Sequence, residues 1–133
     1  YYADMFGWRE MASEVAKVYW ALPPRDRARA VFFGNNYGEA AAIDVFGRRL
    51  GLPPAISGHN NYYLWGPRGH DGSVIIILGG SPQHYTQLFH SFTIAGRIDT
   101  PLAMPYETNL PVYVLRDMKM PLPVYWPNTK HYE

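Results

Sequence analysis

The chain has 133 residues, of which 47% are hydrophobic and 17% charged, enough apolar material for one domain with a core. Twelve Lys and Arg stand against eleven Asp and Glu, and without a dense basic run a nucleic-acid partner is not expected. The absence of cysteine excludes disulfides and thiol catalysis, and the longest apolar run, VIIIL at 74–78, is too short for a membrane helix of roughly 20 residues.

The first predicted element is an amphipathic helix over residues 8–22. Apolar side chains recur along it at spacings of four, three and four, namely Met11, Val15, Val18 and Leu22. Charged residues occupy the positions between them and can face water. Two prolines at 23–24 end the helix.

A βαβ unit is predicted next. A short buried strand at 30–33 precedes a helix over 37–50, and a second short strand follows at 55–57. Asn36 is a natural N-cap, and Glu39 stands three positions later, as in a capping box. Such a unit implies parallel pairing of its strands through a right-handed crossover.

The second half of the chain supplies further strands. The β-branched run at 73–80 predicts a central strand that is buried on both faces. A short helix begins at Ser81, and strands are expected at 91–98 and 110–118. The proline-rich tail, PLPVYWPNTKHYE, is expected to lie extended on the surface.

These elements predict a single α/β domain over residues 1–133, with a three-layer, mostly parallel sheet and helices on both faces, as in Rossmann-like folds. One alternative stays open. Residues 91–98 and 110–118 can instead pair as an antiparallel edge, because their connection, DTPLAMPYETN, is long enough for either arrangement.

Three of the predicted strands end in unusual turns, GNNYGE, SGHNNYYLWG and GGSPQ. Ligands of open parallel sheets bind at the carboxyl ends of the strands, so these turns are expected to share one edge. Amide groups both donate and accept hydrogen bonds, and aromatic faces cover apolar sugar surfaces. The candidate ligand-binding residues are Asn35, Asn36, Tyr37, Glu39, His59, Asn60, Asn61 and Trp65. In the alternative interpretation these side chains bond one another and the backbone, and only hold the loops.

No catalytic set is predicted. His59 lies two residues from Ser57, but no nucleophile elbow of the GxSxG type is present. The histidines lack a metal-binding spacing, and no two carboxylates are spaced as a catalytic pair, so neither a metal nor a cofactor is expected. A free-standing small α/β enzyme, a hydrolase or sugar-phosphate enzyme that uses Glu39 and His59, is the alternative.

Several long strings carry a family resemblance. ADMFGW, NNYGEAAAIDVFG, GLPPAISGHNNYYLWGP and AGRIDTPLAMPYE resemble the C-terminal soluble region of bacterial integral-membrane glycosyltransferases of family 39, the protein-mannosyltransferase-like group. The resemblance runs across nearly the whole chain. It implies a membrane enzyme that takes sugar from a polyprenyl-phosphate donor, with its catalytic carboxylates in loops of the membrane part.

From this resemblance the chain is expected to be a piece excised from the C-terminus of a larger membrane protein, an expectation that its start without Met fits. It would be an accessory, non-catalytic domain on the extracytoplasmic face of the membrane, periplasmic or at the cell surface. Its partner would be the membrane-embedded portion of the same polypeptide, and it would contact a sugar, a polyprenyl-phosphate sugar or an acceptor. No catalytic residue is carried over to this chain, and a purely structural role stays open.

Overall fold

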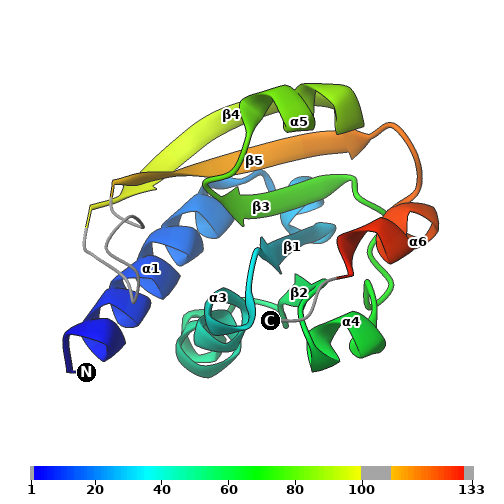
Figure 1. Cartoon of the computed structure of the whole chain (residues 1–133). Helices are drawn as coiled ribbons and strands as arrows, with labels where there is room; N and C mark the ends of the chain where they lie inside the picture. Colours follow the sequence, from blue (N-terminus) through cyan, green and yellow to red (C-terminus); the bar gives the residue numbers. More distant parts are fainter. Residues whose placement is uncertain (1, 100–108, 131–133) are drawn as a thin grey trace.

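A computed structural model of the chain describes residues 2–99 and 109–130 (Figure 1). The elements, in chain order, are α1 (Tyr2–Ala21), α2 (Pro24–Arg27), β1 (Ala30–Gly34), α3 (Tyr37–Ala42), the π-helical turn η1 (Ile43–Gly47), the 3-10 turn η2 (Arg48–Leu50), β2 (Ile56–Ser57), α4 (Asn61–Trp65), β3 (Val74–Leu78), α5 (Pro82–Leu88), β4 (Phe89–Ile98), β5 (Leu110–Met118), α6 (Leu122–Tyr125) and the 3-10 turn η3 (Trp126–Thr129).

The five strands form one mixed sheet in the order β2-β1-β3-β5-β4. Strands β2, β1 and β3 run parallel, whereas β5 runs antiparallel to both β3 and β4, and most paired residues are antiparallel. The predicted mostly parallel, Rossmann-like sheet is therefore wrong, and the antiparallel alternative for 91–98 and 110–118 is confirmed. Parallel neighbours need a crossover connection, usually a helix, whereas consecutive strands such as β4 and β5 can pair antiparallel without one.

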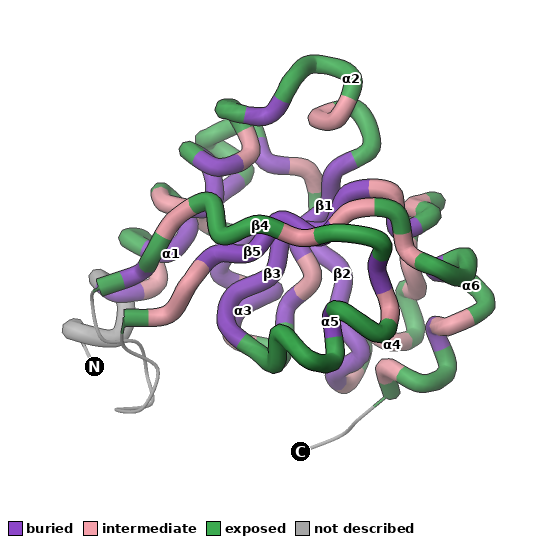
Figure 2. The backbone as a smooth tube through the Cα atoms, turned by 90° about the horizontal axis from the view of Figure 1, so that it is seen from above, coloured by how far each residue is buried: buried purple, intermediate pink, exposed green. Residues whose placement is uncertain are grey.

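The parallel half of the sheet confirms the predicted βαβ unit. Phe33 of β1 stands opposite Ile56 of β2 on one side and Ile77 of β3 on the other. All five residues of β3 are buried, as its β-branched run predicted. Figure 2 shows this contrast, with β3 buried at the centre and β4 exposed along most of its length at the edge.

Alternate residues of the central strands serve two separate cores, because successive side chains of a strand point to opposite faces. On one face, residues such as Ile76 and Val114 pack with α1 and α3. On the other face, Ile75, Ile77 and Leu115 pack with residues from α5 and from the α6–η3 segment. The second face carries the groove described below.

Helix α4 lies within the predicted turn SGHNNYYLWG, and two further helical segments differ from prediction. The helix expected over 37–50 begins at Tyr37 but continues as a π-helical turn from Ile43 and a 3-10 turn from Arg48. The tail was expected to lie extended, and this is wrong for its described part: α6 and η3 fold back, because Leu122 and Trp126 are apolar enough to be buried against the sheet. Residues 131–133 lie outside the described residues.

Candidate functional site

A groove of about 360 Å³, here called the central groove, crosses the face of the sheet between α5 and the α6–η3 segment. Its floor is made by side chains that point to the same face of three neighbouring strands, namely Phe33, Ile75, Ile77 and Leu115. The volume lies within the range of small-molecule sites, about 300–1,000 Å³. The floor offers a ligand only apolar contacts.

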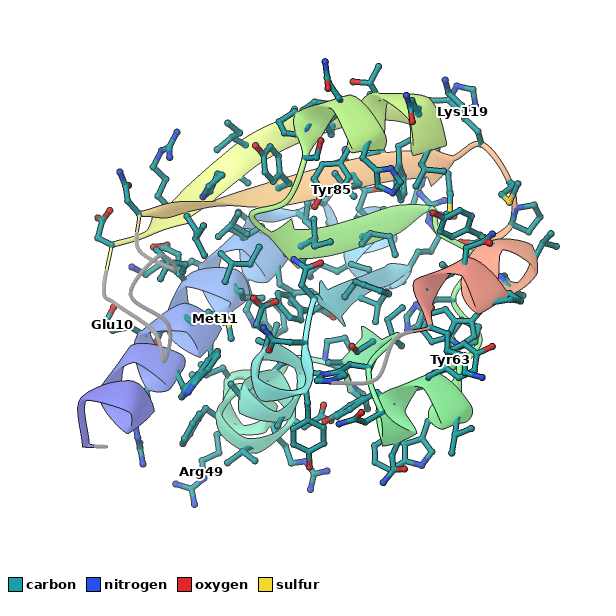
Figure 3. The ribbon with its side chains drawn as sticks, viewed as in Figure 1. Glu10, Met11, Arg49, Tyr63, Tyr85 and Lys119 are labelled. Atoms are coloured by element: carbon teal, nitrogen blue, oxygen red, sulfur yellow. The ribbon has the colours of Figure 1, made fainter. Side chains whose placement is uncertain are left out.

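The two walls of the groove come from short helices. Tyr85 and Leu88 of α5 form one wall, and Leu122 and Tyr125 of α6 form the other. Tyr85, labelled in Figure 3, is fixed in its wall by two kinds of contact. Its hydroxyl donates a hydrogen bond to the Gly79 carbonyl over 2.7 Å, and its ring packs edge-on against the rings of Phe92 and Tyr113. Burial raises the pKa of this hydroxyl, so it remains a neutral donor.

Polar side chains gather at one end of the central groove. Asn35 follows β1, Ser81 and His84 follow β3, and Asn128 and Thr129 come from η3. The far end, toward Met118, is apolar. Because β1 and β3 are parallel, the polar end lies at the carboxyl edge of the strands, where ligands of such sheets bind. The groove therefore has an amphiphilic character along its length.

The turns after the three parallel strands do meet, as predicted, and hydrogen bonds join them. The Asn35 side-chain amide donates to the carbonyl of Leu78 over 2.8 Å, linking the turn after β1 to the end of β3. The backbone N–H of Tyr37 donates to Nδ1 of His59 over 2.6 Å, and this bond links the turn after β1 to the turn after β2. The turns after β1, β2 and β3 are therefore joined by hydrogen bonds at one edge of the sheet.

Asn36 and Glu39 hold the start of α3. The side chain of Asn36 accepts a hydrogen bond from the Glu39 N–H over 2.9 Å, which confirms the predicted N-cap. The Glu39 carboxylate accepts from the N–H of Asn35 over 3.0 Å, one residue before the position a capping box uses. Glu39 is only 2% exposed, so a large ligand cannot reach its carboxylate in this arrangement.

The remaining predicted residues lie on and beside α4. Tyr62 is buried and makes edge contacts with the rings of Tyr37 and Trp65, with centroid distances of 5.6 and 4.9 Å. Trp65 itself is 54% exposed, and Asn60 and Asn61 stand at the start of the helix. These residues form an aromatic row away from the central groove, and of the eight candidates only Asn35 lines that groove.

Residues between 58 and 63 also contact the tail and hold it in place. The indole N–H of Trp126 donates to the carbonyl of Tyr63 over 3.0 Å, and the two rings stack with planes 9° apart. The backbone of Thr129 lies directly against Gly58. The SGHNNYYLWGP segment therefore packs against the α6–η3 segment and supports that wall of the central groove.

Sequence reasoning missed the central groove because its polar end draws on the tail, whose helical turns were not predicted. The available signal was the pattern of the tail itself, in which Leu122 and Trp126 are spaced by one helical turn. Among residues 2–99 and 109–130, no group of three or more His, Asp or Glu side chains is placed to hold a metal ion.

No family model matches the chain, and neither the curated proteins nor the solved structures compared with it include a match. In the described ranges, every helix is too short or too polar to span a bilayer.

Proposed function

We propose that this chain is a non-catalytic binding domain, an extracytoplasmic accessory part of a membrane glycosyltransferase that uses a polyprenyl-phosphate sugar. The central groove is its binding site. The observation that carries the proposal is the groove itself, an apolar floor with polar side chains gathered at one end. Its partner is the membrane-embedded portion of the same polypeptide, as the family resemblance implies.

The groove suits a ligand that is apolar at one end and polar at the other. A branched isoprenoid chain can pack on Ile75, Ile77 and Leu115, with about 0.8 kcal/mol gained for each buried CH₂ group. Its phosphate or sugar then faces Asn35 and Ser81, which offer amide and hydroxyl groups.

The proposal of a non-catalytic role is supported by how the acidic groups are used. Asp44 accepts hydrogen bonds from the Tyr62 hydroxyl over 2.6 Å and from the Ala55 N–H over 2.9 Å. Burial and the bond to Asp44 raise the pKa of Tyr62, so this hydroxyl stays a donor. Glu39 and His59, the pair that the enzyme alternative needs, already accept backbone hydrogen bonds.

Binding can be tested by NMR titration of the whole chain with farnesyl phosphate, farnesol and mannose 1-phosphate. We expect farnesyl phosphate to shift resonances of α5, α6 and the carboxyl ends of β1 and β3. Leu88→Trp fills the groove from its wall and should weaken this binding at least about tenfold, or 1.4 kcal/mol. Leu64→Trp, on the exposed surface of α4, is the matched control and should leave binding unchanged.

Equal loss in both variants, or no shift with any of the three compounds, would overturn the groove as the binding site. A separate assay addresses catalysis: the purified chain, given a polyprenyl-phosphate sugar and acceptors, should transfer no sugar. Turnover that Glu39→Gln abolishes would instead support the enzyme alternative.

A further inference from the structure

A second cleft, of about 350 Å³, lies between α1 and the η1–η2 turns on the other side of the molecule from α5. We call it the arginine cleft, and it is lined by Arg9, Ser13, Val45, Phe46, Arg49 and Leu50. It shares no residue with the central groove. A ligand of the arginine cleft therefore binds at a separate place from a ligand of the central groove.

The cleft is positively charged. Arg9 and Arg49 line it, and none of the described lining residues carries a carboxylate. Among the described side chains, the ion pairs are those that Asp26 makes with Arg29 and Arg116, and neither pair involves Arg9 or Arg49. Glu10 follows Arg9 in sequence but lies about 100° further around the helix, and Figure 3 shows it on the opposite side of α1 from Arg49.

Three residues with hydrogen-bond donors line the cleft, and one of them is positioned by an aromatic ring. The Arg9 guanidinium lies 4.8 Å from the centre of the Phe46 ring, a cation–π contact that positions it. Ser13 is one helical turn further along α1, on the same face as Arg9. Each guanidinium group can donate two parallel N–H hydrogen bonds to phosphate oxygens, and the Ser13 hydroxyl can donate one more.

The other half of the cleft is apolar and exposed. Val45 is 63% exposed, and Leu50 stands beside it. The indole N–H of Trp20 donates to the Leu50 carbonyl over 2.8 Å, which places this 53% exposed ring next to the cleft. Arg27 lies over the Trp20 ring at 5.0 Å. Tryptophan with basic and aliphatic neighbours is typical of surfaces at the lipid–water interface.

We propose that the arginine cleft binds the phosphate group of an anionic lipid, with Arg9, Ser13 and Arg49 on the phosphate oxygens and Val45, Leu50 and Trp20 against the acyl region. Free phosphate offers the same oxygens without the apolar part. This contact would orient the domain on a membrane surface. It concerns a lipid of the surrounding bilayer, bound at a site separate from the central groove.

The test is co-sedimentation of the whole chain with phosphatidylcholine vesicles that contain or lack phosphatidic acid. We expect binding only to the anionic vesicles, and the double variant Arg9→Gln/Arg49→Gln should lose it about tenfold or more. The control, Arg97→Gln/Lys119→Gln, removes the same charge from exposed positions elsewhere and should keep most of the binding. Lys119 lies at the far end of the molecule from Arg49 (Figure 3).

Inorganic phosphate is the second arm, followed by NMR. Weak shifts confined to residues 9–13 and 45–50, together with vesicle binding, support the proposal. Shifts with phosphate but no binding to anionic vesicles would overturn the lipid assignment in favour of a free phosphate. Equal loss in both double variants, or equal binding to vesicles without phosphatidic acid, would overturn the site. Farnesyl phosphate binding in the central groove, measured on the same variants, should not change.

Discussion

Replacing Gly58 by alanine tests whether the turn before α4 supports the wall of the central groove. A Cβ built on Gly58 would lie 2.8 Å from the Cβ of Thr129, and closer still to the Thr129 carbonyl. Ordinary contact between carbon atoms needs about 3.5–4.0 Å. The obstacle is backbone, which cannot rotate away as a side chain can, so the η3 turn must move.

The loss in free energy of unfolding depends on which contacts of η3 this movement disturbs. Overpacking a well-packed site costs about 1–3 kcal/mol, and a clash with backbone belongs at the upper end. Full loss of the Trp126 contacts would cost about 3–5 kcal/mol and sets the ceiling. We therefore expect Gly58→Ala to lower the free energy of unfolding by about 3 kcal/mol, or the melting temperature by roughly 10 °C for a chain of this length.

Urea denaturation gives the stability, and the indole NMR signal of Trp126 reports its hydrogen bond to Tyr63. Gly69→Ala is the control, because Gly69 has a φ of +84° with open space around its Cβ position. Alanine at this position introduces backbone strain but no steric clash, and it should lower the free energy of unfolding by about 1 kcal/mol. If both variants lose the same stability and the Trp126 signal stays in place, the reasoning about the η3 contact is refuted.

Three further outcomes are expected. Asn36→Ala removes the N-cap of α3 and should cost about 1 kcal/mol in urea denaturation, whereas Asn36→Ser should recover most of it; equal loss in both would contradict the capping role. Tyr85→Phe leaves the Gly79 carbonyl without its donor and should cost about 1–3 kcal/mol, and an unchanged urea midpoint would argue against that bond. Burial lowers the pKa of His70 below 6.5, so below that pH the unfolded chain binds the proton more readily and stability falls as the pH drops. His70→Gln should flatten this part of the stability–pH curve, and an unaltered slope would assign it to other groups.

The parallel part of the sheet was accessible from sequence because its signals are local. The VIIIL run of β3, the Asn36 cap and the strand–helix–strand spacing each depend on neighbouring residues. The strand order could not be predicted from sequence in the same way. Strand β5 lies between β3 and β4, and that order depends on pairings between residues far apart in the chain, such as Val114 with Ile76. The alternating pattern of residues 110–118 is compatible with antiparallel pairing, but a pattern within one strand does not say which strand is its neighbour.

The candidate site was predictable only in part for a similar reason. Sequence placed the turns containing Asn35 and His59 at one edge, and hydrogen bonds join them there. The residues themselves divide among three tasks: capping, joining turns, and forming the aromatic row around Tyr62. The groove depends on Leu122 and Trp126 folding back from the tail, a tertiary contact that helix propensity in a proline-rich segment does not favour.

The π-helical turn at Ile43–Gly47 divides one continuous helical segment into two phases. A π turn contains one residue more than an α turn, so residues after it are rotated by about 100° relative to an uninterrupted helix. Before the turn, the Glu39 carboxylate accepts from the N–H of Asn35 at the strand edge; within the turn, the Phe46 ring contacts Arg9 of α1. Removal of a single residue there is expected to restore a regular helix and to rotate Arg49, which follows the turn, away from the arginine cleft. The length of this turn therefore sets which neighbours the second half of the segment contacts.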